Sequence, residues 1–234
     1  MRSRHIVAMG GGGFSMEPDN SLLDDFMLSL TGKRKPHVCF VPTAYGDADS
    51  YIERFHQNFP ASRCRSSHLA LFRRQAVNLR DFLLAQDVIY VGGGNTANML
   101  AIWRVHNVDR ILREAWRRGA VLCGISAGAN CWFEACSTDS FGPLAPLRDG
   151  LAFLPGSVCP HYDGEPKRRS TFHQFIAKRQ LPEGIALDDG AAAHFVGLRL
   201  IEVVSSRPRA KGYQICRRGR TVEESDLPTR FLGS

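Results

Sequence analysis

Short apolar runs and amphipathic stretches alternate along the first two-thirds of the chain. Strands are predicted where a few consecutive residues are mostly apolar and a turn signal follows: His5–Met9, Val38–Val41, His68–Phe72, Val88–Val91 and Ala120–Ile125. Helices are predicted where apolar residues recur every three or four positions: Ser21–Leu30, Asp49–Phe59, Leu79–Ala85, Thr96–Val105 and Val108–Arg118. Repeated strand–helix units with short turns predict an α/β fold, with helices on both faces of a mostly parallel sheet.

The last third of the chain has a different pattern, in which short extended runs follow one another across turn signals. These runs are Ile185–Leu187, Ala192–Val196, Leu200–Val204 and Gly212–Cys216. Such spacing favours an antiparallel C-terminal extension at one edge of the sheet. Because no repeat and no linker of biased composition interrupts the chain, we expect one domain over residues 1–234.

The distribution of charge argues against a nucleic-acid partner. The formal net charge is +7, but residues 207–220 hold six cations and no acid, so the rest of the chain carries only +1. A basic C-terminal hairpin more often protects a sheet edge than binds RNA or DNA. No apolar run approaches the roughly 20 residues of a membrane span, and the N-terminus lacks the apolar core of a signal peptide. We therefore expect a cytoplasmic protein without membrane or nucleic-acid partners, and a homodimer is the assembly to test.

The cysteines indicate packing rather than metal binding. There are seven, with no CxxC pair and no His/Cys spacing typical of zinc sites. Several lie in apolar runs, where a free cysteine behaves as a small hydrophobic residue. We expect them to be reduced, and we expect no metal or other cofactor.

The segment Gly124-Ile125-Ser126-Ala127-Gly128 carries the first candidate chemistry. It follows an apolar strand and opens a helix-forming stretch, predicted as Ala127–Ala135. In this context G-x-S-x-G is typical of a nucleophile elbow, a strained turn that exposes the serine Oγ. The amide of Ala127, at the positive end of the helix, could then donate to an oxyanion. The alternative is a serine that only caps a helix after a buried strand.

A second glycine cluster, Gly92-Gly93-Gly94, lies at the end of another predicted strand. In open α/β sheets, ligands bind beyond the carboxyl ends of the strands. Backbone amides at this point could therefore form the other half of an oxyanion hole. The alternative is a phosphate-binding loop, which is disfavoured because the G-x-G-x-x-G and Gly-Lys-Ser/Thr patterns are absent.

A serine nucleophile needs a base, and His161 is the best-placed histidine. It follows the apolar run Gly156–Cys159 and Pro160, so it stands at a strand end like Ser126. Most other histidines fall inside predicted helices or strands, and His194 is the second candidate.

Three carboxylates are candidates for the acid that orients His161. Asp139 lies among small polar residues after the predicted nucleophile helix, Glu134 lies two turns beyond Ser126 on roughly the same helical face, and Asp163 follows His161 by two residues. A triad acid must accept the imidazole Nδ1–H, and sequence spacing does not give that distance. We rank Asp139 first, Glu134 second and Asp163 third.

Three blocks together resemble peptidase E, the alpha-aspartyl dipeptidases of peptidase family S51: Val91–Thr96, Gly124–Asn130 and Cys159–Tyr162. Their order and spacing match the family, and with the strand–helix pattern the resemblance covers most of the chain. It implies a flavodoxin-like or class I glutamine-amidotransferase-like sheet and a serine-type peptidase. By motif position it assigns the nucleophile to Ser126, the base to His161, the oxyanion donors to Gly94 and Ala127, and the acid to Asp139. Glu134 stays open, because family members differ at the acid.

The resemblance also implies short peptide substrates, in particular dipeptides with an N-terminal aspartate. In the aspartyl dipeptidases a basic residue after the histidine segment binds the aspartate side chain. The corresponding stretch here holds three cations, Lys167, Arg168 and Arg169, and does not decide between them. Glu17 and Asp19 are candidates for holding a substrate amino group.

Three alternatives differ in chemistry. Cyanophycinase, also in the family, cleaves an aspartate–arginine polymer, although this chain resembles the compact dipeptidases more. Amidotransferase-like chemistry would place a cysteine at the elbow, where this chain has Ser126. A catalytically silent binding module would not need Ser126, His161 and nearby carboxylates together.

Overall fold

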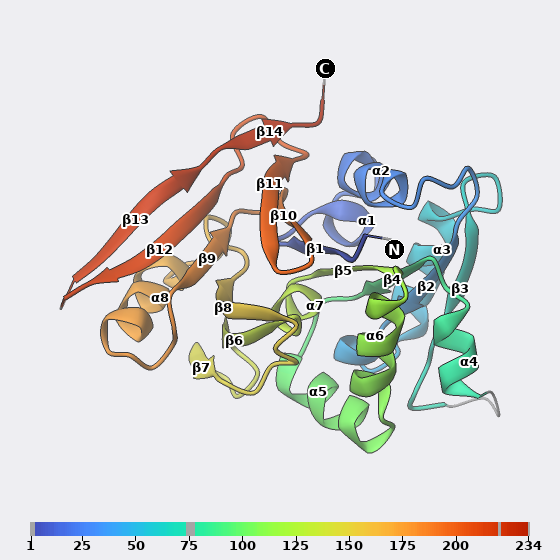
Figure 1. The fold of residues 1–234 in the computed structure, drawn as a ribbon, viewed down its shortest axis with the longest axis horizontal. Helices are drawn as coiled ribbons and strands as arrows, with labels where there is room; N and C mark the ends of the chain where they lie inside the picture. Colours follow the sequence, from blue (N-terminus) through green and yellow to red (C-terminus); the bar gives the residue numbers. More distant parts are fainter. Residues whose placement is uncertain (1–2, 74–77, 220, 234) are drawn as a thin grey trace.

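A computed structural model describes residues 3–73, 78–219 and 221–233 of the chain. Its larger sheet has eight strands in the order β14-β11-β10-β1-β5-β4-β2-β3 (Figure 1). Their bounds are β1 His5–Met9, β2 His37–Val41, β3 Arg65–His68, β4 Val88–Val91, β5 Val121–Ile125, β10 Ala191–Val196, β11 Arg199–Ser205 and β14 Thr229–Phe231. The five strands from β1 to β3 in this order are mutually parallel, as the strand–helix alternation predicts.

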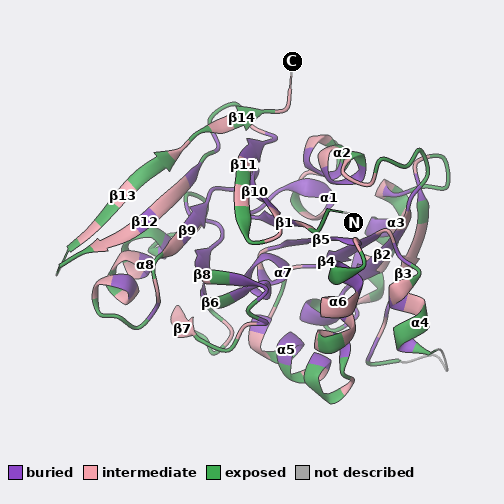
Figure 2. Ribbon diagram, viewed as in Figure 1, coloured by how far each residue is buried: buried purple, intermediate pink, exposed green. Residues whose placement is uncertain are grey.

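Helices cover both faces of the parallel strands, because successive strand residues point to opposite sides. One core cluster packs α4 (Leu79–Leu84), α5 (Thr96–Val105) and α6 (Val108–Arg117) against one face. The other packs α1 (Gly13–Met16), α2 (Leu22–Ser29) and α3 (Asp49–Asn58) against the opposite face. Figure 1 shows α2 above the sheet and α5 and α6 below it. Figure 2 shows β1, β5, β4 and β2 as largely buried, whereas the edge strand β3 is not.

A second sheet of six strands has the order β13-β12-β9-β8-β6-β7. Its strands are β6 Phe133–Thr138, β7 Ala145–Leu147, β8 Leu154–Cys159, β9 Gly184–Leu187, β12 Gly212–Arg218 and β13 Thr221–Leu227, and α8 (Arg168–Ala177) packs on it. The larger core cluster includes residues of both sheets. The chain is therefore a mixed α/β protein with two sheets. None of the helices in the described ranges is long and apolar enough to span a bilayer.

The C-terminal runs do not all extend one edge of one sheet. β10 pairs antiparallel with β1, and β11 pairs antiparallel with β10, whereas β9 and β12 belong to the second sheet. Sequence spacing predicts extended runs but not their partners, because pairing depends on contacts between distant segments.

Two predicted elements are wrong in position. The third strand is Arg65–His68 instead of His68–Phe72. It is the edge strand of the sheet, where its polar side chains stay exposed or half-buried. The helix after the nucleophile ends at Asn130 instead of Ala135, and Phe133 already pairs with Leu154 in the second sheet. Helical propensity in this stretch gives way to sheet pairing and to burial of Trp132 and Phe133.

The basic C-terminal segment is balanced by acids. Lys211 lies 2.5 Å from Asp226, and Arg218 lies 2.7 Å from Glu223 on the facing strand β13. Arg207 bonds Glu17 instead. Arg220, the sixth cation of the segment, lies outside the described residues. Three of the five described cations, Arg207, Lys211 and Arg218, therefore pair with acids outside the segment.

A buried carboxyl, Asp24, lies within the core on the α1–α3 face. It is 1 % exposed; its Oδ2 accepts the Phe14 amide at 2.8 Å, and its Oδ1 has no partner among the described residues. Burial raises the pKa of Asp24 to about 7, although Arg63 and the Phe14 amide oppose the shift. The folded protein therefore holds this proton at pH values where the unfolded chain, with a pKa near 3.8, has lost it.

We expect Asp24 to make the protein less stable as the pH rises. Because the native pKa exceeds the unfolded pKa, the free energy of unfolding should fall between about pH 4 and pH 7 and then level off. The contribution is on the order of a few kcal/mol. The free energy of unfolding, measured by urea denaturation at several pH values in this range, should fall less steeply with pH in Asp24→Asn than in wild type. Asp19→Asn, which changes an exposed aspartate, is the control and should keep the wild-type pH dependence. If Asp24→Asn has the same pH dependence of the unfolding free energy as wild type, the raised pKa of Asp24 is contradicted.

Candidate active site

Ser126 occupies the strained turn that its sequence context predicts. Its backbone has φ 55° and ψ −112°, a conformation that non-glycine residues rarely adopt. It joins β5 to the short helix α7 (Ala127–Asn130). The two flanking glycines allow the turn to close, since a Cβ on Gly124 would lie 2.4 Å from the Gly128 oxygen and one on Gly128 2.3 Å from the Val91 oxygen. This is the geometry expected of a nucleophile elbow.

His161 stands just beyond β8 and also has a positive φ, 53°. It is buried, and its Nδ1 lies 2.7 Å from Oδ1 of Asp189. This contact fixes the imidazole plane and, with Nδ1 as the donor, leaves Nε2 as the nitrogen that can take up a proton. The strand-end position expected for His161 is therefore present, together with a carboxylate partner that the sequence ranking did not contain.

Asp189 lies in the turn between β9 and β10 and is held tightly. Its amide donates to Oδ1 of Asp163 at 2.8 Å, so Asp163 supports Asp189 and not the imidazole. Gly11 and Gly164 border its carboxylate. A Cβ at either position would lie 2.0 or 2.1 Å from a carboxylate oxygen, so only glycine fits there without a shift. The sequence signal that could have found it is the acidic pair Asp188-Asp189 followed by Gly190 at the end of an apolar run.

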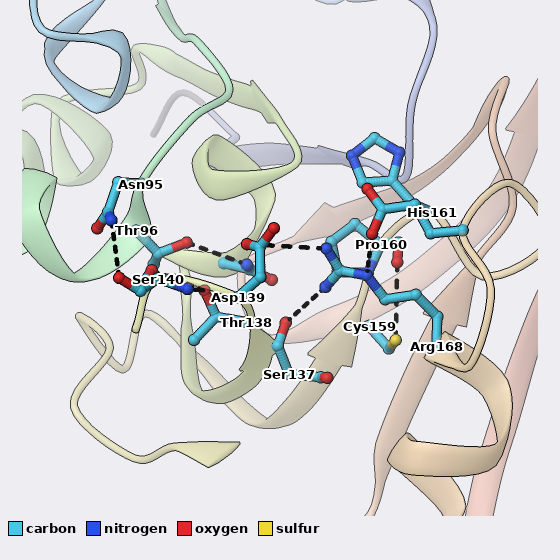
Figure 3. A network of polar contacts seen from close by, with 12 residues as sticks. Asn95, Thr96, Ser137, Thr138, Asp139, Ser140, Cys159, Pro160, His161 and Arg168 are labelled. Atoms are coloured by element: carbon cyan, nitrogen blue, oxygen red, sulfur yellow. Dashed lines mark hydrogen bonds and ion pairs between the residues drawn. The ribbon is translucent and has the colours of Figure 1, made fainter. Parts of the chain in front are cut away.

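Asp139, ranked first as the acid, is placed differently. Its side chain is 60 % exposed and lies 3.9 Å from the guanidinium of Arg168. Figure 3 shows the Asp139 carboxylate directed toward Arg168. His161 therefore contacts Asp189 and not Asp139. This corrects the ranking that placed Asp139 first as the acid beside the imidazole. The physical reason is that residues 133–138 form β6 and not a helix, which moves the following turn.

Glu134, ranked second, lies on β6 with its side chain exposed, and its Oε2 accepts the amide of Gly156 at 3.0 Å. The expectation that it shares a helical face with Ser126 fails with the predicted helix. His194, the second candidate base, lies on β10, where its Nε2 is 2.9 Å from Nδ1 of His5. Burial lowers the pKa of His194, and the neighbouring Glu202 opposes the shift.

The glycine run after β1 joins the parts of the site, a role that sequence analysis did not predict. Backbone oxygens of consecutive residues accept one amide each: Met9 from Ser126, Gly10 from His161, and Gly11 from Gly190. The distances are 3.2, 3.2 and 3.1 Å. One short segment therefore sets the relative positions of the serine, the histidine and the Asp189 turn. The available signal was the run of four glycines at 10–13.

Ser126 and His161 line one cavity of about 320 Å³, together with Gly93 and Gly94. The second glycine cluster therefore meets the elbow, as its place at a strand end predicts. The Gly93 amide donates to the Tyr51 hydroxyl at 3.2 Å, and burial raises the pKa of this tyrosine. Ala127, the other predicted oxyanion donor, is the buried first residue of α7.

The cations expected to bind an aspartate are engaged elsewhere. Arg168 is 3 % exposed and donates to Glu165 at 2.7 Å. It also donates to the Ser137 carbonyl at 3.1 Å (Figure 3). Arg169 pairs with Glu224 on β13. Neither these two nor Lys167 is among the residues that line the serine cavity.

The acid candidates for a substrate amino group are also placed away from the serine cavity. Glu17 accepts from Ser206 and Arg207. Asp19 is exposed and outside the cavity lining.

The cysteines are free, and all but the partly exposed Cys216 are buried, as expected of packing residues. Across the described ranges, no three His, Cys, Asp or Glu side chains gather as a metal-binding group.

The chain is similar to known peptidases along most of its length. The family model described as "Peptidase family S51" matches residues 6–203. The uncharacterized peptidase YgaJ of Bacillus subtilis (strain 168) is 51 % identical over 230 residues, covering 98 % of this chain and all of the relative. Peptidase E of Haemophilus influenzae is 31 % identical over 74 % of this chain and 81 % of its own length. The crystal structure of a peptidase from an acI-B1 Actinobacterium shares the fold, with a TM-score of 0.67, 19 % identity and coverage of 96 % and 95 %.

The fold and these matches define the class of protein, an α/β peptidase. The chain belongs to peptidase family S51, because the family model covers far more than half of it. The resemblance seen in the three sequence blocks is thereby confirmed at the level of the family.

Proposed function

We propose that this protein is a serine-type peptidase that hydrolyses short peptides through an acyl-enzyme on Ser126, with His161 as base and Asp189 as the acid. The observation that carries the proposal is the 2.7 Å contact between His161 Nδ1 and Asp189 in a site whose cavity His161 shares with the strained Ser126. A nucleophile, a base and a group that orients the base are the three parts of a catalytic triad.

In this mechanism the Ser126 Oγ attacks the peptide carbonyl while its proton passes to His161 Nε2. Asp189 stabilises the imidazolium that forms. The carbon–nitrogen bond then breaks, and His161 returns the proton to the leaving amine. In the second half of the reaction, water attacks the acyl carbon while His161 takes its proton. The bond between the acyl carbon and Oγ then breaks, and His161 returns the proton to Ser126.

The amides of Gly94 and Ala127 are the proposed donors to the oxyanion. Gly94 lines the cavity, and Ala127 follows the nucleophile at the helix start. Donors held by the backbone need no reorganisation when charge develops on the carbonyl oxygen, which is why such sites contribute strongly to rate. The Tyr51 hydroxyl, by engaging the neighbouring Gly93 amide, supports the position of this loop.

We propose dipeptides, and N-terminal aspartyl dipeptides in particular, as the substrates. A cavity of about 320 Å³ matches the lower end of small-ligand sites, which favours a short peptide over a polymer. The family resemblance supplies the aspartyl preference.

The parallel strands support a flavodoxin-like arrangement of the larger sheet. Counting β2, β3, β4 and β5 as first to fourth gives the order 2-1-3-4, as in flavodoxin, and β1 occupies the place of the fifth strand. Ser126 then lies at the carboxyl end of β5, the edge where ligands bind in open sheets.

Covalent labelling tests the proposal together with a cleavage screen. A fluorophosphonate should label wild-type protein on Ser126, and dipeptides that differ only in their first residue should be cleaved at different rates, aspartyl ones fastest. Labelling that persists in Ser126→Ala would assign the nucleophile elsewhere. Labelling of wild type without cleavage of any dipeptide would leave the nucleophile but reject the substrate class.

A further inference from the structure

Among the described residues, one permanently charged side chain lines the serine cavity, that of Arg54. The other lining residues given by this part of the chain are uncharged apart from His161, and none of them is an aspartate or glutamate. Arg54 belongs to α3, where sequence analysis predicted a helix and named no site residue. A small-molecule site commonly combines an apolar surround with a few polar groups that fix orientation, so a lone cation at this place points to an anionic group on the ligand.

Arg54 is anchored by the neighbouring wall of the cavity. Its Nη1 donates to the Ser15 carbonyl at 3.2 Å, and one helical turn earlier the Tyr51 hydroxyl contacts the Ser15 hydroxyl. Both contacts tie α3 to the segment that also lines the cavity. The guanidinium has five N–H donors in a planar fork, so the bond to Ser15 leaves donors for a second acceptor.

The other cations near the site are not equivalent. Arg168 is buried against Glu165 and the Ser137 carbonyl, and Arg169 is paired with Glu224. Moving either toward the cavity would break a charge-assisted contact. Arg54 faces no such cost, because the one hydrogen bond that its side chain makes to a described residue is to a neutral carbonyl.

We infer that Arg54 binds a carboxylate of the substrate and so makes this cavity selective for short anionic peptides. The inference rests on the proposed function, since it places the peptide beside Ser126. Arginine suits the role because its fork matches both oxygens of a carboxylate. The carboxylate has two sources in an aspartyl dipeptide, the first side chain and the C-terminus, and substrate analogues separate them.

The experiment measures binding apart from chemistry. Titration calorimetry compares Ser126→Ala with Ser126→Ala/Arg54→Gln for three ligands: Asp-Leu, Asn-Leu and Asp-Leu amide. Two control substitutions are made in the same Ser126→Ala background. Arg54→Lys retains the charge but lacks the planar fork of donors, and Arg199→Gln removes an exposed arginine on β11 outside the cavity.

Loss of the arginine should weaken binding of Asp-Leu about 10–100-fold, the range of a hydrogen bond to a charged group. The ligand that lacks the recognised carboxylate should not respond: Asn-Leu if Arg54 binds the side chain, Asp-Leu amide if it binds the C-terminus. Arg54→Lys should restore part of the affinity, and Arg199→Gln should change none.

Equal affinity of both proteins for Asp-Leu, or equal weakening for all three ligands, would overturn the inference. Failure of the proposed function looks different. In that case Ser126→Ala would cleave the dipeptides during the titration, or wild type would escape fluorophosphonate labelling, whatever residue stands at position 54. In active enzyme, Arg54→Gln should raise KM by the same factor and leave kcat and the rate of labelling nearly unchanged.

Discussion

Replacing Ser126 by alanine is expected to lower turnover by about 10⁴–10⁶-fold, the scale seen for triad nucleophiles. The substitution removes the Oγ that forms the acyl-enzyme, while the elbow keeps its backbone contacts, including the bond from residue 126 to the Met9 carbonyl at 3.2 Å. The measurement is kcat on the best dipeptide of the screen, together with circular dichroism to show that the fold is retained.

The control for this prediction is another serine of the same cavity. Ser15 lines it too, but from α1 and without a strained backbone. Ser15→Ala should therefore change kcat far less than Ser126→Ala and should leave labelling intact. If Ser126→Ala turns over peptides at nearly the wild-type rate, Ser126 is not the nucleophile and the mechanism fails.

Replacing Asp189 by asparagine is expected to lower kcat by about 10²–10⁴-fold, with the upper end set by the corresponding change in a known triad. An amide has nearly the shape of a carboxylate and fits between the bordering glycines, so the fold should persist. Its NH₂ group can face His161 Nδ1 and hold the wrong tautomer, and it brings no charge to stabilise the imidazolium.

Asp139→Asn is the matched control, because it makes the same chemical change at the residue that sequence ranking placed first. Asp139 is largely exposed and its ion pair with Arg168 is long, at 3.9 Å, so its loss should alter kcat by no more than about threefold. The two variants give opposite outcomes under the two assignments. If Asp139→Asn loses most of its kcat while Asp189→Asn keeps a kcat near that of wild type, Asp189 is rejected as the triad acid.

Local pattern was sufficient to predict β4, α5 and the strained turn at the nucleophile. Val88–Val91 and Thr96–Val105 have the bounds that apolar runs and spacing predict, and Ser126 has the strained turn that two glycines and a preceding strand imply. These features depend on interactions within a few residues: a buried strand is apolar on both sides, and a sharp turn needs small neighbours. The family could also be recognised, because its three blocks are contiguous in the sequence.

The tertiary structure decided which carboxylate meets His161. Asp189 is 28 residues from His161 along the chain. It reaches the imidazole because β9 and β10 belong to different sheets and the glycine run after β1 bonds both His161 and the Asp189 turn. Asp139 is nearer in sequence, yet the early end of α7 carries it toward Arg168. Arg54, too, reaches the cavity that Ser126 lines only through the packing of α3 on α1. Sequence determines the local conformations and the chemical groups, whereas side-chain partners depend on strand pairing between distant segments, whose energies local pattern does not contain.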